Sequence, residues 1–419
     1  MRISSLQIFN IANNSMADAN EAIVKTQEQL STGRRVLRPS DDPVASTKIL
    51  SINEELATTE QYRNNINIAK NDLLVGEAVL DGVLNVIQRI QELTVQAGNT
   101  ATLSATEYGS LANEVDSRLD ELQSLLNTQN ANGDFIFGGY KSQDEPFTGD
   151  ANTGFRYNGD DGQKFIKVAN NTFVASSDSG KAAFVDVESA RPSITTYPSE
   201  GNRSVPPVQI SLGQVTDREA FDEFFPEDMV ISFNEDTNVV PNGKNFTVTE
   251  RSTGRVILAD QEYSAGMEFE VNGVSVTLTG DPVSAAPGQA GDRLFIDSTN
   301  KQDVLTTLAR FSDVMRSFDG SPESRTAITE NIADTLDNLT NAQTSVLEIT
   351  SKIGARANTL ESTEELHFDA SLVLQELLSD LQDIDYAEAS TRLSSQTLIL
   401  QAAQTAFVRI SNLSLFNQL

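Results

Sequence analysis

The chain has 419 residues, which is enough for two or three domains, and its formal net charge is −30. Such an acidic balance argues against nucleic-acid binding, which needs clustered lysine and arginine. The absence of cysteine excludes disulfides and thiolate metal sites, and the absence of tryptophan is more typical of helical rods than of a compact enzyme. No apolar run approaches the ~20 residues that cross a bilayer. The N-terminus lacks the unbroken apolar core of a secretory signal peptide, so we expect any export to follow another route.

Charge is unevenly distributed along the chain. Residues 1–40 and 387–419 together carry a net charge of +3, so the other residues carry −33. In a tube of many identical copies, like charge at the packed core would repeat around the ring, whereas on the outside it aids solubility. The distribution therefore favours terminal segments that pack within an assembly.

Glycine and proline divide the chain into three parts. Residues 132–300 contain 17 of the 24 glycines and 9 of the 12 prolines, whereas residues 323–419 contain one glycine and no proline. Because both residues interrupt helices, this pattern predicts a helical region, a turn-rich β insert and a second helical region.

A heptad pattern predicts a first helix over residues 1–32. Its apolar stripe, which we expect to form an assembly interface, consists of Phe9, Met16, Ile23 and Leu30. Gly33 is suited to end this helix, and residues 34–42 then form a connector. Asp42 followed by Pro43 is typical of an N-cap with proline at the first helical position, so we expect a second helix to begin there.

The second predicted helix runs to about residue 98, with a stripe at Ile52, Thr59, Ile66, Leu73, Leu80, Ile87 and Thr94. At 1.5 Å per residue it is on the order of 80 Å long. A third helix, over about 105–130, is expected to fold back on it. Helix returns near residue 301 with a stripe at Ile332, Leu339, Val346, Ile353 and Leu360. A terminal helix over 386–418 carries a second predicted interface, formed by Leu393, Leu400, Ala403, Phe407, Ile410 and Leu413.

From about residue 135 the apolar period changes to two, which predicts strands. The clearest are 165–169, 246–250, 256–259 and 274–279, and Asn-Gly pairs at 158–159, 242–243 and 272–273 lie between or beside them. We expect one or two small antiparallel β units.

Together these elements predict a mainly α fold with a β insert: a long antiparallel helical bundle built from both ends of the chain, and a central antiparallel β domain. The expected domains are the terminal assembly helices (1–40 and 384–419), a helical bundle (41–138 and 301–383) and an outer insert (139–300). Two helices with one apolar face each are marginal in water. We therefore expect the terminal pair to be poorly ordered in the monomer and to order on assembly.

Several segments resemble the bacterial flagellin superfamily. Residues 30–46 (LSTGRRVLRPSDDPVAS) look like the signature after its first helix, and the form RPSDDP is similar to the hook-associated protein 3 family of the hook–filament junction. Residues 133–139 and 145–147 resemble that family's exit into its insert, and residues 385–393 and 414–419 complete the match. The connector signature consists of Gly33, Arg34, Arg35, Arg38, Pro39, Ser40, Asp41, Asp42 and Pro43.

The resemblance implies a structural subunit of the extracellular bacterial flagellum that forms a ring of its own copies. Its expected neighbours are hook-associated protein 1 below and flagellin above. The resemblance also implies export as an unfolded chain by the flagellar type III apparatus, without a cleaved signal peptide. An export chaperone is expected to bind the C-terminal helical region.

The connector also admits other roles. Asp41 and Asp42 could ligate a metal, but helix capping beside Pro43 is favoured. The three arginines at 34, 35 and 38 form either a solvated patch or ion pairs with these aspartates or with a neighbouring subunit.

No catalytic constellation is evident. His367 is the only histidine and falls in register with the stripe of residues 332–360, which favours a place at the edge of the bundle seam over catalysis. The acidic turn at 158–162 lacks the spacing of a calcium loop. No metalloprotease, hydrolase, Walker or dinucleotide motif is present, so we expect no enzyme, metal or cofactor.

Two other functions compete with the junction subunit. A flagellin filament subunit would share the terminal helices. An adhesin or enzyme could reside on the insert, although an acidic insert without tryptophan disfavours sugar binding.

Overall fold

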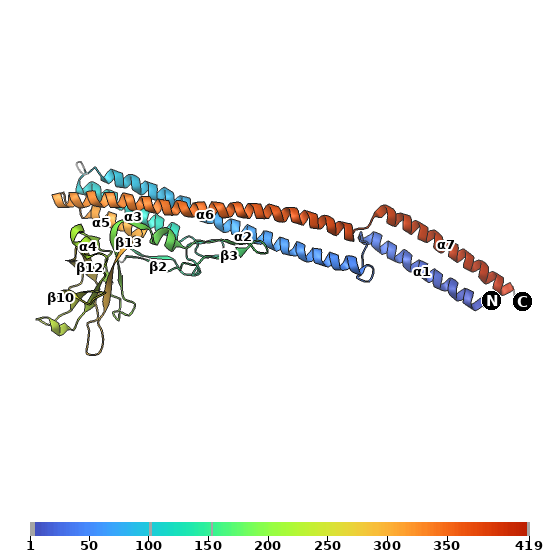
Figure 1. Ribbon diagram of the computed structural model, residues 1–419, viewed down its shortest axis with the longest axis horizontal. Coiled ribbons are helices and arrows are strands. Elements are labelled where there is room, and N and C mark those ends of the chain that lie inside the picture. The colour runs from blue at the N-terminus through green and yellow to red at the C-terminus, as the bar shows by residue number, and fades with distance from the viewer. Residues whose placement is uncertain (1–4, 100–102, 152–153, 417–419) are drawn as a thin grey trace. The chain divides into compact units, whose positions relative to one another are not determined.

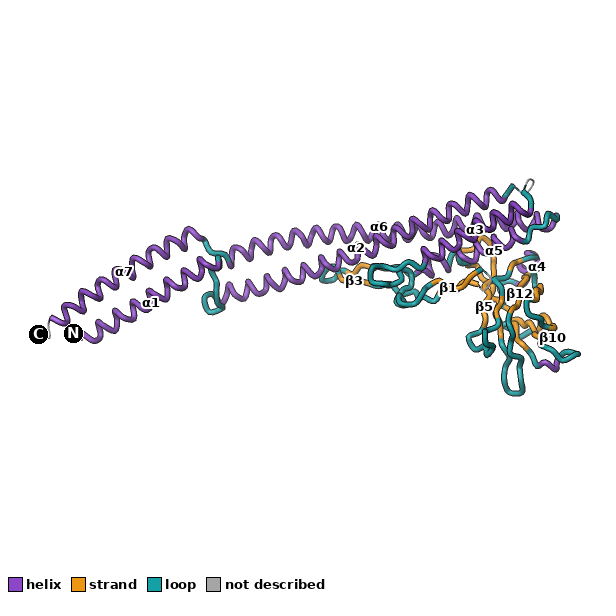
Figure 2. Tube along the Cα trace, turned by 180° about the vertical axis from the view of Figure 1, so that it is seen from behind, coloured by secondary structure: helices purple, strands orange, loops and turns teal. Residues whose placement is uncertain are grey.

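A computed structural model describes residues 5–99, 103–151 and 154–416; within these, the side chains at positions 5, 6, 8 and 410–416 lie outside the description. The helices are α1 Ser5–Thr32, α2 Pro43–Ala97, α3 Ala105–Leu126, α4 Arg218–Phe224, α5 Val304–Arg316, α6 Pro322–Gln382 and α7 Tyr386–Phe416, with short helical turns η1 Lys181–Val185 and η2 Asp236–Asn238. Figures 1 and 2 show their arrangement. No helix in these ranges is both long and apolar enough to span a bilayer.

The strands all lie between α3 and α5. They are β1 Phe147–Asp150, β2 Gly154–Tyr157, β3 Phe165–Lys167, β4 Phe173–Ala175, β5 Glu188–Pro198, β6 Gln209–Ile210, β7 Gln214–Val215, β8 Met229–Phe233, β9 Asn245–Glu250, β10 Val256–Glu262, β11 Met267–Val271, β12 Val274–Thr279 and β13 Arg293–Lys301. The mainly α fold with a central antiparallel β region is thus confirmed.

Contacts divide the chain into two units, residues 1–65 with 361–419 and residues 66–360. Both long helices, α2 and α6, contribute to each unit. The predicted domain boundaries near residues 40 and 384 lie at the connectors between helices, not at the division between these two units. The predicted domain division remains a prediction.

In the first unit, α1 and α7 lie side by side (Figures 1 and 2). The parts of α2 and α6 that belong to this unit also meet, because the ring of Tyr62 stacks on His367 with centroids 5.4 Å apart. His367 is buried, which places it within the seam that its register predicted rather than at its edge.

The second unit contains the bundle core, formed by α2, α3, α5 and α6. The predicted stripe of α2 is buried from Ile66 to Thr94, and the stripe of α6 is buried from Ile332 to Leu360. The only polar residue of the α2 stripe in this unit, Thr94, donates its hydroxyl to the carbonyl of Ile90 at 2.8 Å, so its burial leaves no hydroxyl proton unsatisfied. The heptad patterns therefore identified the faces that pack.

Two helix boundaries differ from the predictions. The third helix begins as predicted, where Ser104 and Glu107 form a capping box, but it ends at Leu126 rather than near 130. Asn127 stops it by exchanging hydrogen bonds with the backbone of Phe147, of 2.8 and 3.0 Å, which turns the chain toward β1. The returning helix begins at Val304, but it is interrupted after Arg316 by Gly320, whose φ of +86° suits glycine.

The insert has two parts. The hairpins β1–β2 and β3–β4 pack onto the bundle core through Phe147, Val168 and Val174. The remaining strands form a five-stranded sheet of order β10-β9-β8-β13-β5 and a smaller sheet of order β11-β12-β6, in which β7 also pairs with β12. These two sheets share a separate core, and Figure 2 shows them gathered beside one end of the bundle.

The four predicted strands are present as β3, β9, β10 and β12. The other nine strands in the described ranges were not predicted individually, among them β5, β8 and β13 of the larger sheet. Asn272 and Gly273 both have positive φ, 45° and 72°, and join β11 to β12 as a tight hairpin turn. The other two Asn-Gly pairs lie in connecting loops.

Candidate functional site

The connector after α1 is built around Gly33. Its φ is +72°, and an added Cβ would lie 3.0 Å from the hydroxyl of Tyr386 at the start of α7. Its carbonyl accepts a hydrogen bond of 3.0 Å from the amide of Ile384. Glycine is needed here both for the left-handed backbone and for the close approach of α7.

A short backbone pairing joins the two connectors of the first unit. Arg34 and Asp383 form an antiparallel bridge, and the amide of Arg35 donates to the carbonyl of Gln382 at 2.7 Å. The guanidinium of Arg35 also donates to the carbonyl of Leu381 at 2.8 Å. The end of α6 and the end of α1 are therefore held together by main-chain atoms.

Asp41 closes the connector as a loop. Its carboxylate accepts from Lys25 of α1 at 2.7 Å and from the amides of Leu37 and Arg38 at 3.2 and 3.0 Å. These bonds, led by the one from Lys25, hold the pKa of Asp41 below its ordinary value.

Asp42 caps α2 as predicted. Its carboxylate accepts from the amide of Ala45, in the first turn of α2, at 2.9 Å. Arg35 lies 3.5 Å from the other oxygen of Asp42, an exposed pair that contributes little. Within the described residues, Arg34 and Arg38 form no ion pair. Of the three arginines, only Arg35 pairs with either aspartate.

Both aspartates are thus engaged in capping and ion pairing. In the described part of the chain, no group of three or more histidine, cysteine, aspartate or glutamate residues is placed to hold a metal ion. Pro39 and Ser40 lie exposed in the turn that leads to these aspartates.

The predicted interface residues of the terminal helices lie on α1 and α7. Phe9 and Phe407 contact each other across the pair, with ring centroids 5.1 Å apart. Near the connector, Gln29 accepts from Arg392 at 3.2 Å and donates to the carbonyl of Arg35 at 2.6 Å. Met16, Ile23, Leu30, Leu393, Leu400 and Ala403 are half-buried. The side chains of Ile410 and Leu413 lie outside the described residues.

The first unit also exposes large apolar side chains away from these stripes, which the heptad spacing does not predict. They are Ile11 and Val24 on α1, Val44 and Leu50 on α2, Leu366, Phe368, Leu372, Val373 and Leu377 on α6, and Leu398, Ile399 and Val408 on α7. Consecutive apolar residues such as 372–374 and 398–400 are the signal, since one helix face cannot bury neighbours in sequence. Exposed apolar surface of this extent is typical of a protein that associates.

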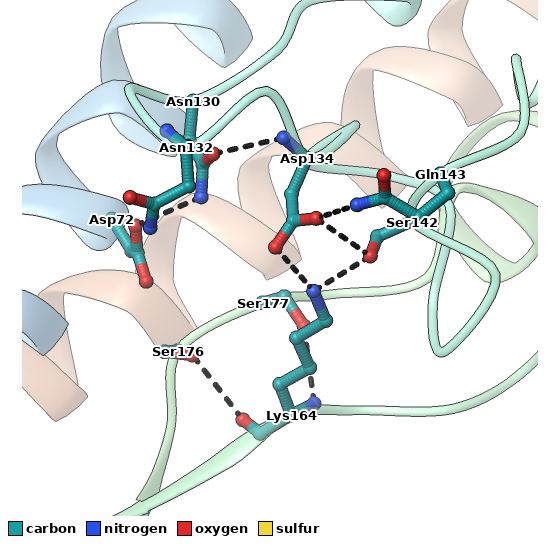
Figure 3. A network of polar contacts seen from close by, with 9 residues as sticks. All are labelled: Asp72, Asn130, Asn132, Asp134, Ser142, Gln143, Lys164, Ser176 and Ser177. Atoms are coloured by element: carbon teal, nitrogen blue, oxygen red, sulfur yellow. Dashed lines mark hydrogen bonds and ion pairs between the residues drawn. The ribbon is translucent and has the colours of Figure 1, made fainter.

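A polar pocket in the second unit is another candidate (Figure 3). The ammonium of Lys164 lies 2.8 Å from Asp134 and 2.7 Å from Ser142, and Asn130 donates to Asp72 of α2 at 3.3 Å. Lys164 lowers the pKa of Asp134, whereas burial raises that of Asp72. Because each group has a partner from another segment, this network fastens the start of the insert to α2.

Comparison with known proteins agrees with this geometry. The model of the bacterial flagellin N-terminal helical region matches residues 3–142, and that of the bacterial flagellin C-terminal helical region matches residues 336–419. Together they cover more than half of the chain and contain both terminal helices and the connector. The chain belongs to the flagellin family.

The flagellin-family relatives include hook-associated proteins. Flagellar hook-associated protein 3 of Salmonella typhimurium is 36% identical over 147 residues, which are 35% of this chain and 46% of that protein. The same-named protein of Escherichia coli is 35% identical over 148 residues. The chain thus spans just under half the length of these curated relatives. A flagellin of Bacillus subtilis is 29% identical over 127 residues, which are 30% of this chain.

A solved structure extends the likeness from the two terminal helical regions to most of the chain. The crystal structure of flagellar hook associated protein-3 from Legionella pneumophila has a TM-score of 0.52 at 26% identity, covering 80% of this chain and 98% of that chain. A hook-associated protein structure from Vibrio parahaemolyticus, at 15% identity and a TM-score of 0.50, supports the fold alone. The insert-bearing architecture is therefore one found in hook-associated proteins.

Proposed function

We propose that this flagellin-family chain is a structural subunit of the bacterial flagellum that joins the hook to the filament. The observation that carries the proposal is the likeness to the Legionella hook-associated protein 3, which extends over 98% of that chain. By sequence, flagellar hook-associated protein 3 of Salmonella typhimurium is 36% identical over 147 residues, whereas a flagellin of Bacillus subtilis is 29% identical over 127 residues. The structural likeness and the higher sequence identity both support the junction role over the filament-subunit alternative.

The proposed mechanism is assembly without catalysis. The apolar residues of α1 and α7, including Phe9 and Phe407, pack into the axial core. The exposed apolar side chains of α2 and α6 supply lateral contacts between copies. The connector keeps the helix ends aligned through the bonds among Gly33, Arg35 and residues 382–384. The two sheets formed by β5 to β13, which share a separate core and are called the β domain below, face outward.

The proposed partners are further copies of this chain in a ring, hook-associated protein 1, flagellin and an export chaperone. We place the subunit in the extracellular flagellum at the hook–filament junction. Export would proceed through the flagellar type III system without a cleaved signal peptide. The near-neutral terminal segments favour packing against such neighbours, since they do not repeat acidic charge around a ring.

Deletion of the gene in its own host tests the junction role. The expected phenotype is complete hooks, no filaments, and flagellin released as monomer into the medium, restored by the wild-type chain. Loss of filament protein itself, without released flagellin, would support the filament-subunit alternative. Normal filaments in the deletion strain would refute both.

A further inference from the structure

A second polar pocket in residues 66–360, separate from the one around Lys164, has no part in the assembly role described above. It has a volume of about 60 Å³ and lies where β5 and α4 meet α5 and α6. Figure 2 shows β5, α4 and α5 close together at this end of the bundle. Its wall includes Arg191, Arg218, Arg310, Asp334 and Asn338. Three of these five side chains are guanidinium groups.

Arg310 of α5 is the deepest of them, with 8% of its surface exposed. Its two terminal nitrogens donate only to neutral acceptors: the Ser193 hydroxyl, the Gln302 side-chain oxygen, and the carbonyls of Ile194 and Leu212, at 2.8–2.9 Å. Its Nε–H is buried and finds no acceptor among the described residues. A buried charge with an unsatisfied donor is costly unless a counter-charge or acceptor completes it.

The other charged groups near the pocket do not supply a counter-charge that contacts Arg310. Arg191 and Arg218 share a single carboxylate, that of Asp334, at 3.2 and 3.4 Å. Asp303 affects Arg310 only at longer range, and its carboxylate caps α5 by accepting from Thr306 at 2.7 Å. The wall of the pocket therefore carries three cations against one anion, in a chain whose net charge is −30.

The buried Arg310 still carries its charge at neutral pH. Burial lowers the pKa of Arg310 to about 10, with the Asp303 carboxylate opposing and Arg218 adding to the shift, so Arg310 stays charged at neutral pH. Burial raises the pKa of Asp334, whereas the charges of Arg191 and Arg218 oppose that shift.

We propose that this pocket binds a small inorganic oxyanion, phosphate or sulfate, which accepts hydrogen bonds from the Nε–H of Arg310 and from the guanidinium of Arg218. The volume of about 60 Å³ is several times the roughly 10–15 Å³ that one water needs. Guanidinium groups match the geometry of tetrahedral oxyanions. Because Arg310 already holds the carbonyls of Ile194 and Leu212 to α5, a bound anion strengthens the attachment of the β domain to the bundle.

Calorimetry and thermal unfolding of the full chain test this inference, with phosphate and sulfate in separate arms and chloride at matched ionic strength. We expect heat of binding, and a rise in the melting temperature that saturates with concentration, in at least one oxyanion arm and not in chloride. The two arms distinguish the anions. Absence of binding heat in both arms would leave only water in the pocket and overturn the inference.

Three variants separate a site from general salt effects. Arg218→Gln should lose the saturating rise, whereas Arg255→Gln, an exposed arginine paired with Glu250 at 2.9 Å elsewhere in the β domain, should keep it. Asp334→Asn removes the competing carboxylate and should tighten oxyanion binding at least threefold, an effect that a purely structural role would not produce. Equal stabilisation of all variants by sulfate would reflect solvent exclusion and contradict the proposal.

Discussion

Asp41 and Asp42 are adjacent in the chain, yet their carboxylates bind different partners. Asp41 faces Lys25 and the amides inside the connector, whereas Asp42 faces the amide of Ala45 at the start of α2. The capping role of Asp42 was predictable from local sequence, since an aspartate before proline satisfies a free helical amide. The partner of Asp41 was not, because it lies 16 residues earlier on another helix.

Replacing Asp42 by alanine should loosen the first turn of α2. The lost cap is worth about 1 kcal/mol, so local opening should become roughly fivefold more frequent. Hydrogen exchange at Ala45 and Ser46 measures this directly. Asp42→Asn keeps the acceptor oxygen and should exchange like the wild type; equal acceleration in both variants would mean that charge, not capping, matters.

The connector should loosen in acid through Asp41. Because its folded pKa lies below the ordinary value, its contribution is present above that ordinary pKa and is lost as pH falls through the folded value. We expect exchange of the Leu37 and Arg38 amides to be protected at neutral pH and to lose protection below about pH 4. Asp41→Asn should show the acid level of protection at every pH, and an unchanged acid transition in that variant would assign the effect elsewhere.

At the scale of elements, heptad spacing located the buried faces of α2 and α6 because a long helix has to repeat the same packing at each turn. The same reasoning could not locate β5 and β13. These two strands pair with each other across about a hundred residues, as Ser193 with Thr299 and Tyr197 with Phe295, and pairing at such separation leaves no local signature.

The site chemistry was only partly predictable for a similar reason. The connector signature was visible because it is local. Arg310 was missed because an arginine in a helix ordinarily faces water; its burial depends on β5 and on the carbonyl of Leu212, which are far away in sequence. The structure buries nearly all of α5, including the polar residues Thr306 and Thr307, and the sequence pattern did not predict this.

Leu80 offers a test of the bundle core. It is fully buried on α2, whereas Leu74 on the same helix is 61% exposed. Leu80→Ala should lower the free energy of unfolding by about 2–5 kcal/mol, since it removes buried methyl groups and leaves a cavity. Leu74→Ala should change it by less than about 0.5 kcal/mol. Denaturant melts of both variants decide the matter, and equal losses would contradict the packing described.

The terminal helices can be tested through α7. Leu400→Asp or Phe407→Asp would place a charge on the face that meets α1, and we expect either variant to block assembly while residues 66–360 keep their fold. Gln401→Asp adds the same charge at an exposed neighbouring position and should assemble. Motility in the complemented deletion strain and circular dichroism of the purified chain are the measurements. Motile Leu400→Asp cells would show that this face is misplaced.

For the whole molecule, stability should be unequal between the two units. Residues 66–360 contain both buried cores, whereas the unit that holds α1 and α7 exposes much of its apolar surface. Helices that bury little are stabilised little, because most helix stability comes from packing. Assembly would cover those exposed apolar side chains and so add the burial that stabilises these helices.

Hydrogen exchange on the full chain measures this inequality without truncation. In the dilute monomer, we expect amides of α1 and α7 to exchange at least a hundredfold faster than those of α2 between Ile66 and Ala97. In assembled material the terminal amides should become protected, while those of the bundle should change little, because their core is already complete. Equal protection of α1 and the bundle in the monomer would mean that pairing with α7 alone suffices. The terminal helices would then be prebuilt parts rather than segments that order on assembly.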